Sequence, residues 1–272
     1  EVFKLNKDGS GFTVLRHFLS ANDCRNPQAE LFEGSDGFLY GTAYAGGGFT
    51  RGGVFRLSKT GSDYSIVSGF NFGGLQAPRQ PMGGLIEGLD GALYGATELG
   101  GSSNNGAIFK LDKDGTGSTV LKSLGLVAGG AEQPNCTLVQ AADGLLYGTS
   151  AFGGSANYGA IFRIGTNGAD FAVVQSFPFG GAREPRAGLI VMRDGSLLGT
   201  TRIGGGPDKG TIFRLELPNG RLSVLRSLND FFGDGIRPRG PLVRGSYGFY
   251  YGTTFGGGSD GQGTVFRIWL PN

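Results

Sequence analysis

The chain has 272 residues, a formal net charge of +2 and a hydrophobic content of 39%, which is sufficient for a packed core. No apolar run is long enough to span a bilayer, so membrane insertion is not expected. The small net charge and the placement of the aromatic residues in short strands argue against a nucleic-acid partner. Cys24 and Cys136 lack the spacing of a metal site, and two incidental thiols are favoured over a disulfide between them.

A short motif recurs five times at intervals of about fifty residues. Its first copy is Leu39-Tyr40-Gly41-Thr42, which is followed by a Gly-Gly pair and by an apolar run that ends at Phe55. The equivalent Phe residues are 51 to 54 positions apart, and they are Phe3, Phe55, Phe109, Phe162, Phe213 and Phe266. An unbroken period of this length indicates one repeat architecture without a linker. We therefore predict a single domain over residues 1–272, with five repeats of about 53 residues and one spare terminal strand.

Each repeat is predicted to contain four short β-strands. In the first repeat they cover residues 2–5, 12–18, 31–32 and 38–44, with polar turns between them. Asp36-Gly37 precedes the fourth strand, and Asp-Gly between apolar runs is a strong hairpin signal because the turn needs positive φ. No apolar period of 3.6 residues persists for a dozen positions, so no helix is expected.

This pattern predicts an all-β fold, a five-bladed β-propeller with four antiparallel strands per blade. The chain starts with Val2-Phe3-Lys4-Leu5 and finishes with a strand of the same type, Val265-Phe266-Arg267-Ile268. We expect the N- and C-terminal strands to close the ring, because closure removes exposed sheet edges. Five blades of four strands need only one of these two copies, and the sequence leaves open which one is used.

The repeat reads as Gly-x-Val-Phe-Arg-Leu, then Asp-Gly-x-Leu-Tyr-Gly-Thr-Thr, then Gly-Gly, and it resembles the GloVer tandem repeat over essentially the whole chain. That repeat is found in bacterial surface or secreted proteins with sorting anchors. The resemblance implies a β-propeller in an extracellular or cell-surface setting, with any signal peptide already removed. It supplies no assigned chemistry and no catalytic residues.

Loop length predicts which face of the propeller binds ligands. The Asp-Gly and Lys-Asp-Gly turns are tight and fall on one face, whereas the longer loop before each of five prolines falls on the other, with the Gly-Gly loops. Arginines concentrate beside the prolines and should rim the central mouth; they are Arg25, Arg79, Arg183, Arg186, Arg237 and Arg239. A ring of guanidinium groups favours a carboxylate, sulfate or phosphate ligand. The alternative is that they pair with nearby acids and only hold the loops; those acids are Asp23, Glu30, Glu184, Asp230 and Asp234.

The residues at one position of the repeat differ in all five copies; a set of equivalent positions is called a column below. This position follows the Tyr-Gly-Thr-Thr tetrad and should lie at the same height in every blade. It holds Tyr44, Glu98, Ala151, Arg202 and Phe255. A lectin with five equal sites would repeat its contact residues, so this variety favours one asymmetric central site that includes Phe255. Drift on an unselected surface would give the same pattern and stays an alternative.

Two classes of enzyme fit the same face. A glycoside hydrolase needs two carboxylates about 5 to 10 Å apart, and the candidates are Glu30, Glu98, Glu184 and Asp230. Glu30 stands out because its column otherwise holds small residues on an inner strand, although pairing with an arginine is the favoured explanation. A lyase on uronic-acid chains needs a cation and a base, roles that fit Arg202 and Tyr44. His17, the one histidine, is expected at the surface of an outermost strand.

No metal site and no cofactor are expected, because one histidine and no cysteine pair do not suit zinc or iron, and the Asp-rich turns lack the distal acid of a calcium loop. We predict a monomeric extracellular propeller that binds an anionic ligand, an acidic polysaccharide, at an arginine-rich mouth. The alternatives are a polysaccharide lyase or glycosidase, with Tyr44, Glu98, Arg202 and Glu30 as catalytic candidates, and an adhesive surface domain without a small ligand.

Overall fold

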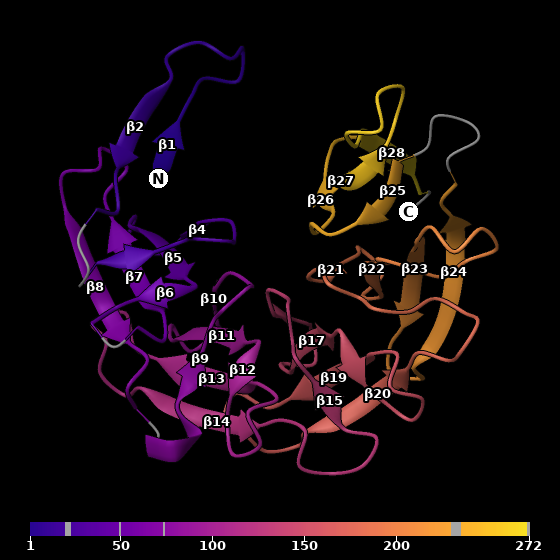
Figure 1. Cartoon of the computed structure of the whole chain (residues 1–272), viewed down its shortest axis with the longest axis horizontal. Helices are drawn as coiled ribbons and strands as arrows, with labels where there is room; N and C mark the ends of the chain where they lie inside the picture. Colours follow the sequence, from indigo (N-terminus) through magenta and orange to yellow (C-terminus); the bar gives the residue numbers. More distant parts are fainter. Residues whose placement is uncertain (20–22, 49, 73, 230–234, 271–272) are drawn as a thin grey trace. The chain divides into compact units, whose positions relative to one another are not determined.

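The computed structural model describes residues 1–19, 23–48, 50–72, 74–229 and 235–270 (Figure 1). Those ranges contain β-strands and one 3₁₀ turn, η1 (Gly74–Gln76), and no α-helix. No helix in the described part is long and apolar enough to cross a membrane. The chain divides into two compact units, Glu1–Ser123 (unit 1) and Leu124–Asn272 (unit 2). The fold is a five-bladed β-propeller, as the repeat predicted.

Four sheets share one antiparallel four-stranded meander. Those of unit 1 are sheet 1, with β4 (Phe32–Glu33), β5 (Leu39–Ala43), β7 (Gly53–Leu57) and β8 (Tyr64–Gly69), and sheet 2, with β10 (Ile86–Glu87), β11 (Leu93–Thr97), β13 (Ala107–Leu111) and β14 (Thr119–Ser123). Those of unit 2 are sheet 3, with β16 (Val139–Gln140), β17 (Leu146–Ser150), β19 (Ala160–Ile164) and β20 (Ala172–Ser176), and sheet 4, with β21 (Ile190–Val191), β22 (Leu197–Thr201), β23 (Thr211–Glu216) and β24 (Arg221–Ser227). Each blade therefore starts two strands later than the sequence repeat.

The two ends of the chain form incomplete versions of this meander. In unit 2, sheet 5 consists of β26 (Val243–Arg244), β27 (Phe249–Gly257) and β28 (Val265–Trp269), and β25 (Gly235–Pro238) pairs with the far end of β27. In unit 1, β1 (Val2–Lys4) pairs with β2 (Thr13–Arg16) as a hairpin. Each terminal strand thus has its partner within its own unit, and closure by both termini stays a prediction.

The meander confirms, for each sheet, the predicted separation of tight turns from long loops. Successive antiparallel strands alternate in direction, so the Asp-Gly turn and the turn before the outer strand share one end of a sheet. The other end carries the long loops, where short ladders form; they are β3 (Cys24–Arg25) with β6 (Ala45–Gly46), β9 (Pro78–Arg79) with β12 (Leu99–Gly100), and β15 (Ala131–Glu132) with β18 (Phe152–Gly153). A single bridge, Arg183 to Ile203, takes this place in the fourth blade. Side chains near the prolines are therefore held at the long-loop end.

In the recurring motif, the glycine makes room for an aromatic ring, and the tyrosine makes a hydrogen bond to the preceding turn. Gly148 on β17 lies opposite Phe162 on β19, and a Cβ atom there would be 2.5 Å from Cζ of that ring. The Tyr147 hydroxyl donates to Asp143 Oδ2 at 2.7 Å, which ties the strand to its own Asp-Gly turn. The same two arrangements occur in sheets 1 and 2.

The cysteines and the histidine match their predicted structural roles. Cys24 and Cys136 are both buried thiols, and burial raises the pKa of Cys24 to about 12. The Thr149 N–H lies 3.2 Å from Cys136 Sγ. His17 is exposed and pairs with Glu1, with 2.6 Å between Nδ1 and Oε1. None of the three has the setting of a reactive group.

Candidate functional site

A strained residue precedes the loop proline in every blade. The residues with positive φ at this position are Asn26, Gln80, Gln133, Glu184 and Arg237, with φ between 52° and 57°. Left-handed backbone is uncommon for residues other than glycine, so the loop must be held in place by its surroundings. In four blades the carbonyl of this residue accepts a hydrogen bond from the N–H of the variable column, namely from Tyr44, Glu98, Ala151 and Arg202. The two columns are therefore neighbours, and the structure brings them together at the long-loop end.

The strand register separates the predicted arginines into three columns. Arg25, Arg79 and Arg183 lie on the short ladders and are equivalent to one another. Arg237 occupies the positive-φ column instead. Arg186 and Arg239 each follow the proline of their own loop by one residue. The predicted arginines therefore occupy three different positions of the repeat.

Four arginines of unit 2 lie close enough for their charges to act on one another, and we call this set the arginine cluster: Arg186, Arg202, Arg237 and Arg239. Arg202 Nη1 donates to Glu184 Oε2 at 2.7 Å, and Arg186 Nε lies 3.5 Å from the same oxygen. Desolvation, followed by the positive charges of the other three arginines, lowers the pKa of Arg239, while Glu184 acts in the opposite direction. Arg186 and Arg202 thus share one carboxylate, that of Glu184.

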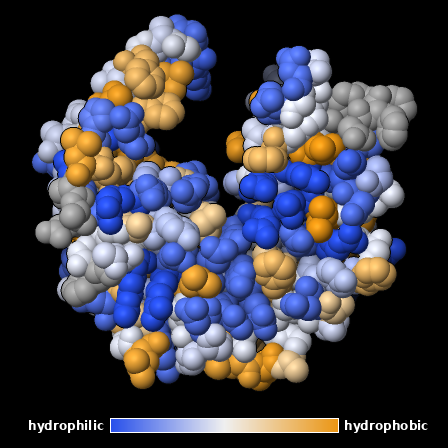
Figure 2. Space-filling view, viewed as in Figure 1, coloured by the Kyte–Doolittle hydropathy of each residue, from blue (hydrophilic) through white to orange (hydrophobic). Residues whose placement is uncertain are grey.

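Aromatic rings border the arginine cluster. The Arg239 guanidinium carbon lies 4.3 Å from the centre of the Phe255 ring, and that of Arg186 lies 5.8 Å from the Phe152 ring. Phe255 is 60% exposed, which is unusual for a Phe in a strand and leaves the ring available to a ligand. Figure 2 shows hydrophilic atoms gathered near β21 and β22, and Arg202 directly follows β22.

Arg183, by contrast, is engaged outside the cluster. Its Nη2 atom donates to both carboxylate oxygens of Asp208 at 2.7 Å, and the guanidinium lies 5.8 Å from the Tyr158 ring. Asp208 Oδ1 also accepts the Gly204 N–H at 2.9 Å, so it fixes the Gly-Gly loop at the same time. Here the alternative of loop-holding ion pairs describes the arginine, although Asp208 was not among the expected partners.

Unit 1 presents a pocket built from the same columns. It has a volume of 290 Å³ and is lined by Asn26, Gln28, Tyr44, Met82 and Glu98. The structure therefore brings together two of the predicted catalytic candidates, Tyr44 and Glu98. Arg25 lines a neighbouring pocket of 360 Å³ with Asn26 and Gln28. The buried Nε atoms of Arg25 and Arg79 have no hydrogen-bond partner in the described part of unit 1, so both guanidinium groups keep unused donors.

Two other acidic candidates do not join these sites. Glu30 is exposed and lies two residues before the inner strand β4, which begins at Phe32. Asp230, like Asp234, lies outside the described residues. Asp23, named in the alternative as a partner of the rim arginines, is buried and pairs at 2.7 Å with Arg16 from β2.

The neutral residues of these sites were not predicted from the sequence. Asn26, Gln28 and Met82 line the unit 1 pocket, and Phe152 borders the arginine cluster. Each of them lies at, or next to, a position of the repeat that holds a charged residue in another blade. Asn135, in the column of Arg186 and Arg239, is buried, and its Oδ1 has no hydrogen-bond partner among the described residues. The described residues contain no group of three or more His, Cys, Asp or Glu side chains placed to hold a metal ion.

Comparison with known proteins identifies a family and a fold. The family model described as the Gloeobacter/Verrucomicrobia repeat matches twice, over residues 1–141 and 133–271. No curated protein matches the sequence. Among solved structures, a chain of a nidogen/laminin complex is 17% identical, with a TM-score of 0.57 over 98% of this chain and 89% of that one.

Two further solved structures are bacterial. A gluconolactonase from Xanthomonas campestris is 16% identical, with a TM-score of 0.58 over 99% of this chain and 78% of that one. TolB from Acinetobacter baumannii is 12% identical, with a TM-score of 0.54 over 97% of this chain and 58% of that one. At these identities the likeness shows the fold alone, so function must be argued from the site.

Proposed function

The chain belongs to the Gloeobacter/Verrucomicrobia repeat family, and we propose that its propeller binds an anionic ligand, an acidic polysaccharide, at the arginine cluster of unit 2. The observation that carries this proposal is the set of four guanidinium groups whose charges act on one another, two of which share the carboxylate of Glu184. Like charges in one place are unfavourable unless a counter-ion joins them. A carboxylate or sulfate group would relieve this repulsion through charge-assisted hydrogen bonds.

The exposed aromatic ring beside the arginine cluster limits which anionic ligands fit the site. Phe255 offers an exposed ring directly beside the Arg239 guanidinium. A ligand that suits this pair has an apolar face next to a negative charge. Uronic acids and sulfated sugars have both, because their ring C–H groups form one face and their acidic group projects from the edge. We place the protein outside the cell, where such polymers occur, in keeping with the resemblance of its repeat.

Calorimetric titration with oligogalacturonate and with a sulfated glycosaminoglycan oligosaccharide tests this proposal, with a neutral cello-oligosaccharide as the control ligand. We expect Arg239→Ala to weaken binding of the acidic sugars about tenfold or more, since hydrogen bonds to charged groups contribute about 1.5–3 kcal/mol. Binding should also weaken as salt is added. Arg183→Ala is the matched control: it removes an arginine that precedes Glu184 in the chain but is held by Asp208, and it should bind as wild type does. Equal affinity of Arg239→Ala and wild type, or equal affinity for the neutral sugar, would reject the cluster as the site.

The pocket of unit 1 favours a second candidate function, a lyase or glycosidase. Tyr44 supplies a hydroxyl and Glu98 a carboxylate to one pocket, and general acid–base chemistry needs two such groups near a substrate. Incubation with the same acidic sugars distinguishes the two functions, because an enzyme releases unsaturated or reducing ends that Tyr44→Phe and Glu98→Gln should abolish. Binding without products leaves a binding module.

A further inference from the structure

An exposed aromatic ring lies at the tip of a loop in unit 2. The loop covers residues 177–184, directly after β20, and carries Phe179, which is 79% exposed. Phe179 and Gly180 are the central residues of a β-turn, because the Gly181 N–H donates to the Pro178 carbonyl at 3.4 Å. Gly180 has a φ of 77°, a conformation that favours glycine at the third position of a turn. The local sequence therefore places the phenylalanine at the tip of the turn, between a proline and two glycines.

Both ends of this loop are bonded to neighbouring carbonyls of the Gly-Gly loop in the third blade. The Phe177 N–H donates to the Gly159 carbonyl at 3.0 Å, and the Glu184 N–H donates to the Tyr158 carbonyl at 2.9 Å. The Tyr158 side chain packs against the buried core of unit 2. Its ring centre lies 5.7 Å from that of Phe179, at an interplanar angle of 43°, a separation at which aromatic rings attract each other. Phe179 is therefore held in place while most of its surface stays in solvent.

The fold does not require this exposure. Phe72 in unit 1 is the equivalent of Phe179, because they follow by three residues the equivalent ladder positions Gly69 and Ser176. Phe72 packs against the core of unit 1, with its ring centre 5.9 Å from that of Phe70. Phe179 instead lies on Tyr158 and faces solvent, so its ring is available to a ligand.

The loop connects Phe179 to the arginine cluster. Glu184 ends the loop, and its carboxylate accepts a hydrogen bond from Arg202 at 2.7 Å. Extended backbone spans about 3.3–3.6 Å per residue, so the Cα atoms of Phe179 and Glu184 are at most about 18 Å apart. An oligosaccharide of a few sugars spans such a distance. We propose, resting on the proposed function, that Phe179 supported by Tyr158 is a second sugar-binding subsite beside the arginine cluster, so that the ligand is a polymer bound along several of its sugars.

A sugar ring suits Phe179 better than a protein surface does. Burial of one phenylalanine covers about 150–250 Å², whereas a specific protein interface takes about 800 Å² from each partner. The neighbours of Phe179 in the turn are a proline and glycines and add little to this area. The C–H face of a pyranose matches an aromatic ring in size, and apolar faces associate in water. The arginine cluster then binds an acidic group, and Phe179 binds the face of a sugar further along the same chain.

Calorimetric titration with digalacturonate and with hexagalacturonate tests the subsite. We expect wild type to bind the hexasaccharide more tightly than the disaccharide. Phe179→Ala should weaken binding of the hexasaccharide about three- to tenfold, the range expected for one aromatic contact. It should leave binding of the disaccharide unchanged, because the arginine cluster holds this ligand, and that result also shows that the variant is folded. Phe179→Trp should restore the affinity for the hexasaccharide, since it keeps a flat aromatic ring.

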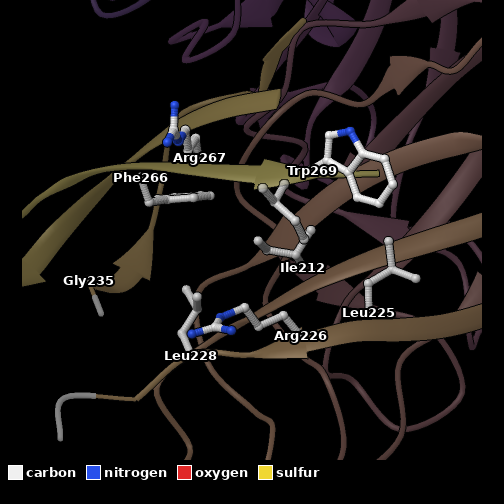
Figure 3. A pocket seen from close by; sticks show the side chains of 9 residues that line it. Ile212, Leu225, Arg226, Leu228, Gly235, Phe266, Arg267 and Trp269 are labelled. Carbon is white, nitrogen blue, oxygen red and sulfur yellow. The ribbon is translucent and has the colours of Figure 1, made fainter. Parts of the chain in front are cut away.

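Trp269 provides the matched control, because it is an exposed aromatic residue away from the arginine cluster. Figure 3 shows it in a pocket of 390 Å³ with Phe266 and Arg226, and no residue that lines this pocket belongs to the cluster or to the loop of Phe179. Trp269 pairs with Phe249 at the tight-turn end of sheet 5, whereas the loop of Phe179 is a long loop. Trp269→Ala should therefore bind both oligosaccharides as wild type does.

The two oligosaccharides separate failure of the subsite from failure of the proposed function. Equal affinity of Phe179→Ala and wild type for the hexasaccharide overturns the subsite alone. Equal losses with both oligosaccharides also overturn it, because Phe179 would then only support the arginine cluster. A loss in Trp269→Ala without one in Phe179→Ala moves the contact to the other pocket and overturns it as well. If wild type binds neither oligosaccharide, the proposed function itself fails, and the subsite fails with it.

Discussion

Glu184 has three structural roles, one for its backbone conformation, one for its carbonyl group and one for its carboxylate. Its backbone is left-handed, with φ of 52°, its carbonyl holds the Arg202 N–H, and its carboxylate contacts both Arg186 and Arg202. In the free protein this carboxylate is the internal counter-ion of the arginine cluster. If the proposed function holds, an acidic ligand competes with the Glu184 carboxylate for the arginines of the cluster.

This competition gives the first prediction, which rests on the proposed function. Glu184→Gln keeps the size of the side chain and an oxygen that can accept a hydrogen bond from Arg202, but it removes the negative charge. We expect acidic oligosaccharides to bind about three- to tenfold more tightly, since the cluster then lacks its internal counter-ion, and we expect the gain to shrink with added salt. Titration at two salt concentrations measures both effects. Weaker binding would instead mean that Glu184 serves to position Arg202.

At the level of the elements, each central strand pair depends on a glycine opposite an aromatic ring. At Gly148 an added Cβ would lie 2.5 Å from Phe162 Cζ and 2.7 Å from Leu138 Cδ2, both side chains of the blade core. Gly148→Ala should therefore destabilise the protein by about 1–3 kcal/mol, the usual cost of overpacking. Urea unfolding followed by circular dichroism measures the change.

Gly206→Ala is the control for that experiment, because an added Cβ at this loop position meets no atom within 4 Å. Its unfolding curve should match that of wild type. If both variants lose the same stability, the effect comes from replacing any glycine of the repeat. The packing of the Phe162 ring against Gly148 would then not be its cause.

The strands and turns could be predicted from the sequence because their causes are local. Asp143, Gly144, Tyr147 and Gly148 occupy fixed positions in a single hairpin, so the repeat displays them as columns. The partner of Arg183 could not be identified in this way. Asp208 lies 25 residues along the chain, and its position resembles that of Asn157, whose side chain accepts the Gly153 N–H in the preceding blade. The sequence does show that an Asp stands at position 208 where the preceding blade has an Asn. Only the fold shows that this Asp accepts hydrogen bonds from Arg183.

At the level of the whole molecule, both units contain the same pair of a buried tyrosine and an exposed aspartate. Tyr40 in unit 1 donates to Asp36, and Tyr147 in unit 2 donates to Asp143. Burial, and then the hydrogen bond to the carboxylate, raises the pKa of both tyrosines from 10.0 to about 12. The folded protein therefore retains these protons at a pH where the unfolded chain has lost them.

The consequence is a stability that depends on alkaline pH. The contribution of these protons is complete below pH 10 and is lost as the pH rises from 10 toward about 12, because the unfolded chain binds fewer protons over that interval. We expect the urea midpoint of the wild type to fall steeply across this range. The double variant Tyr40→Phe and Tyr147→Phe should be less stable at pH 8, since two hydrogen bonds are lost, yet its midpoint should fall less between pH 10 and 12. Equal slopes for the two proteins would show that other groups, such as lysines in surface ion pairs, control unfolding in base.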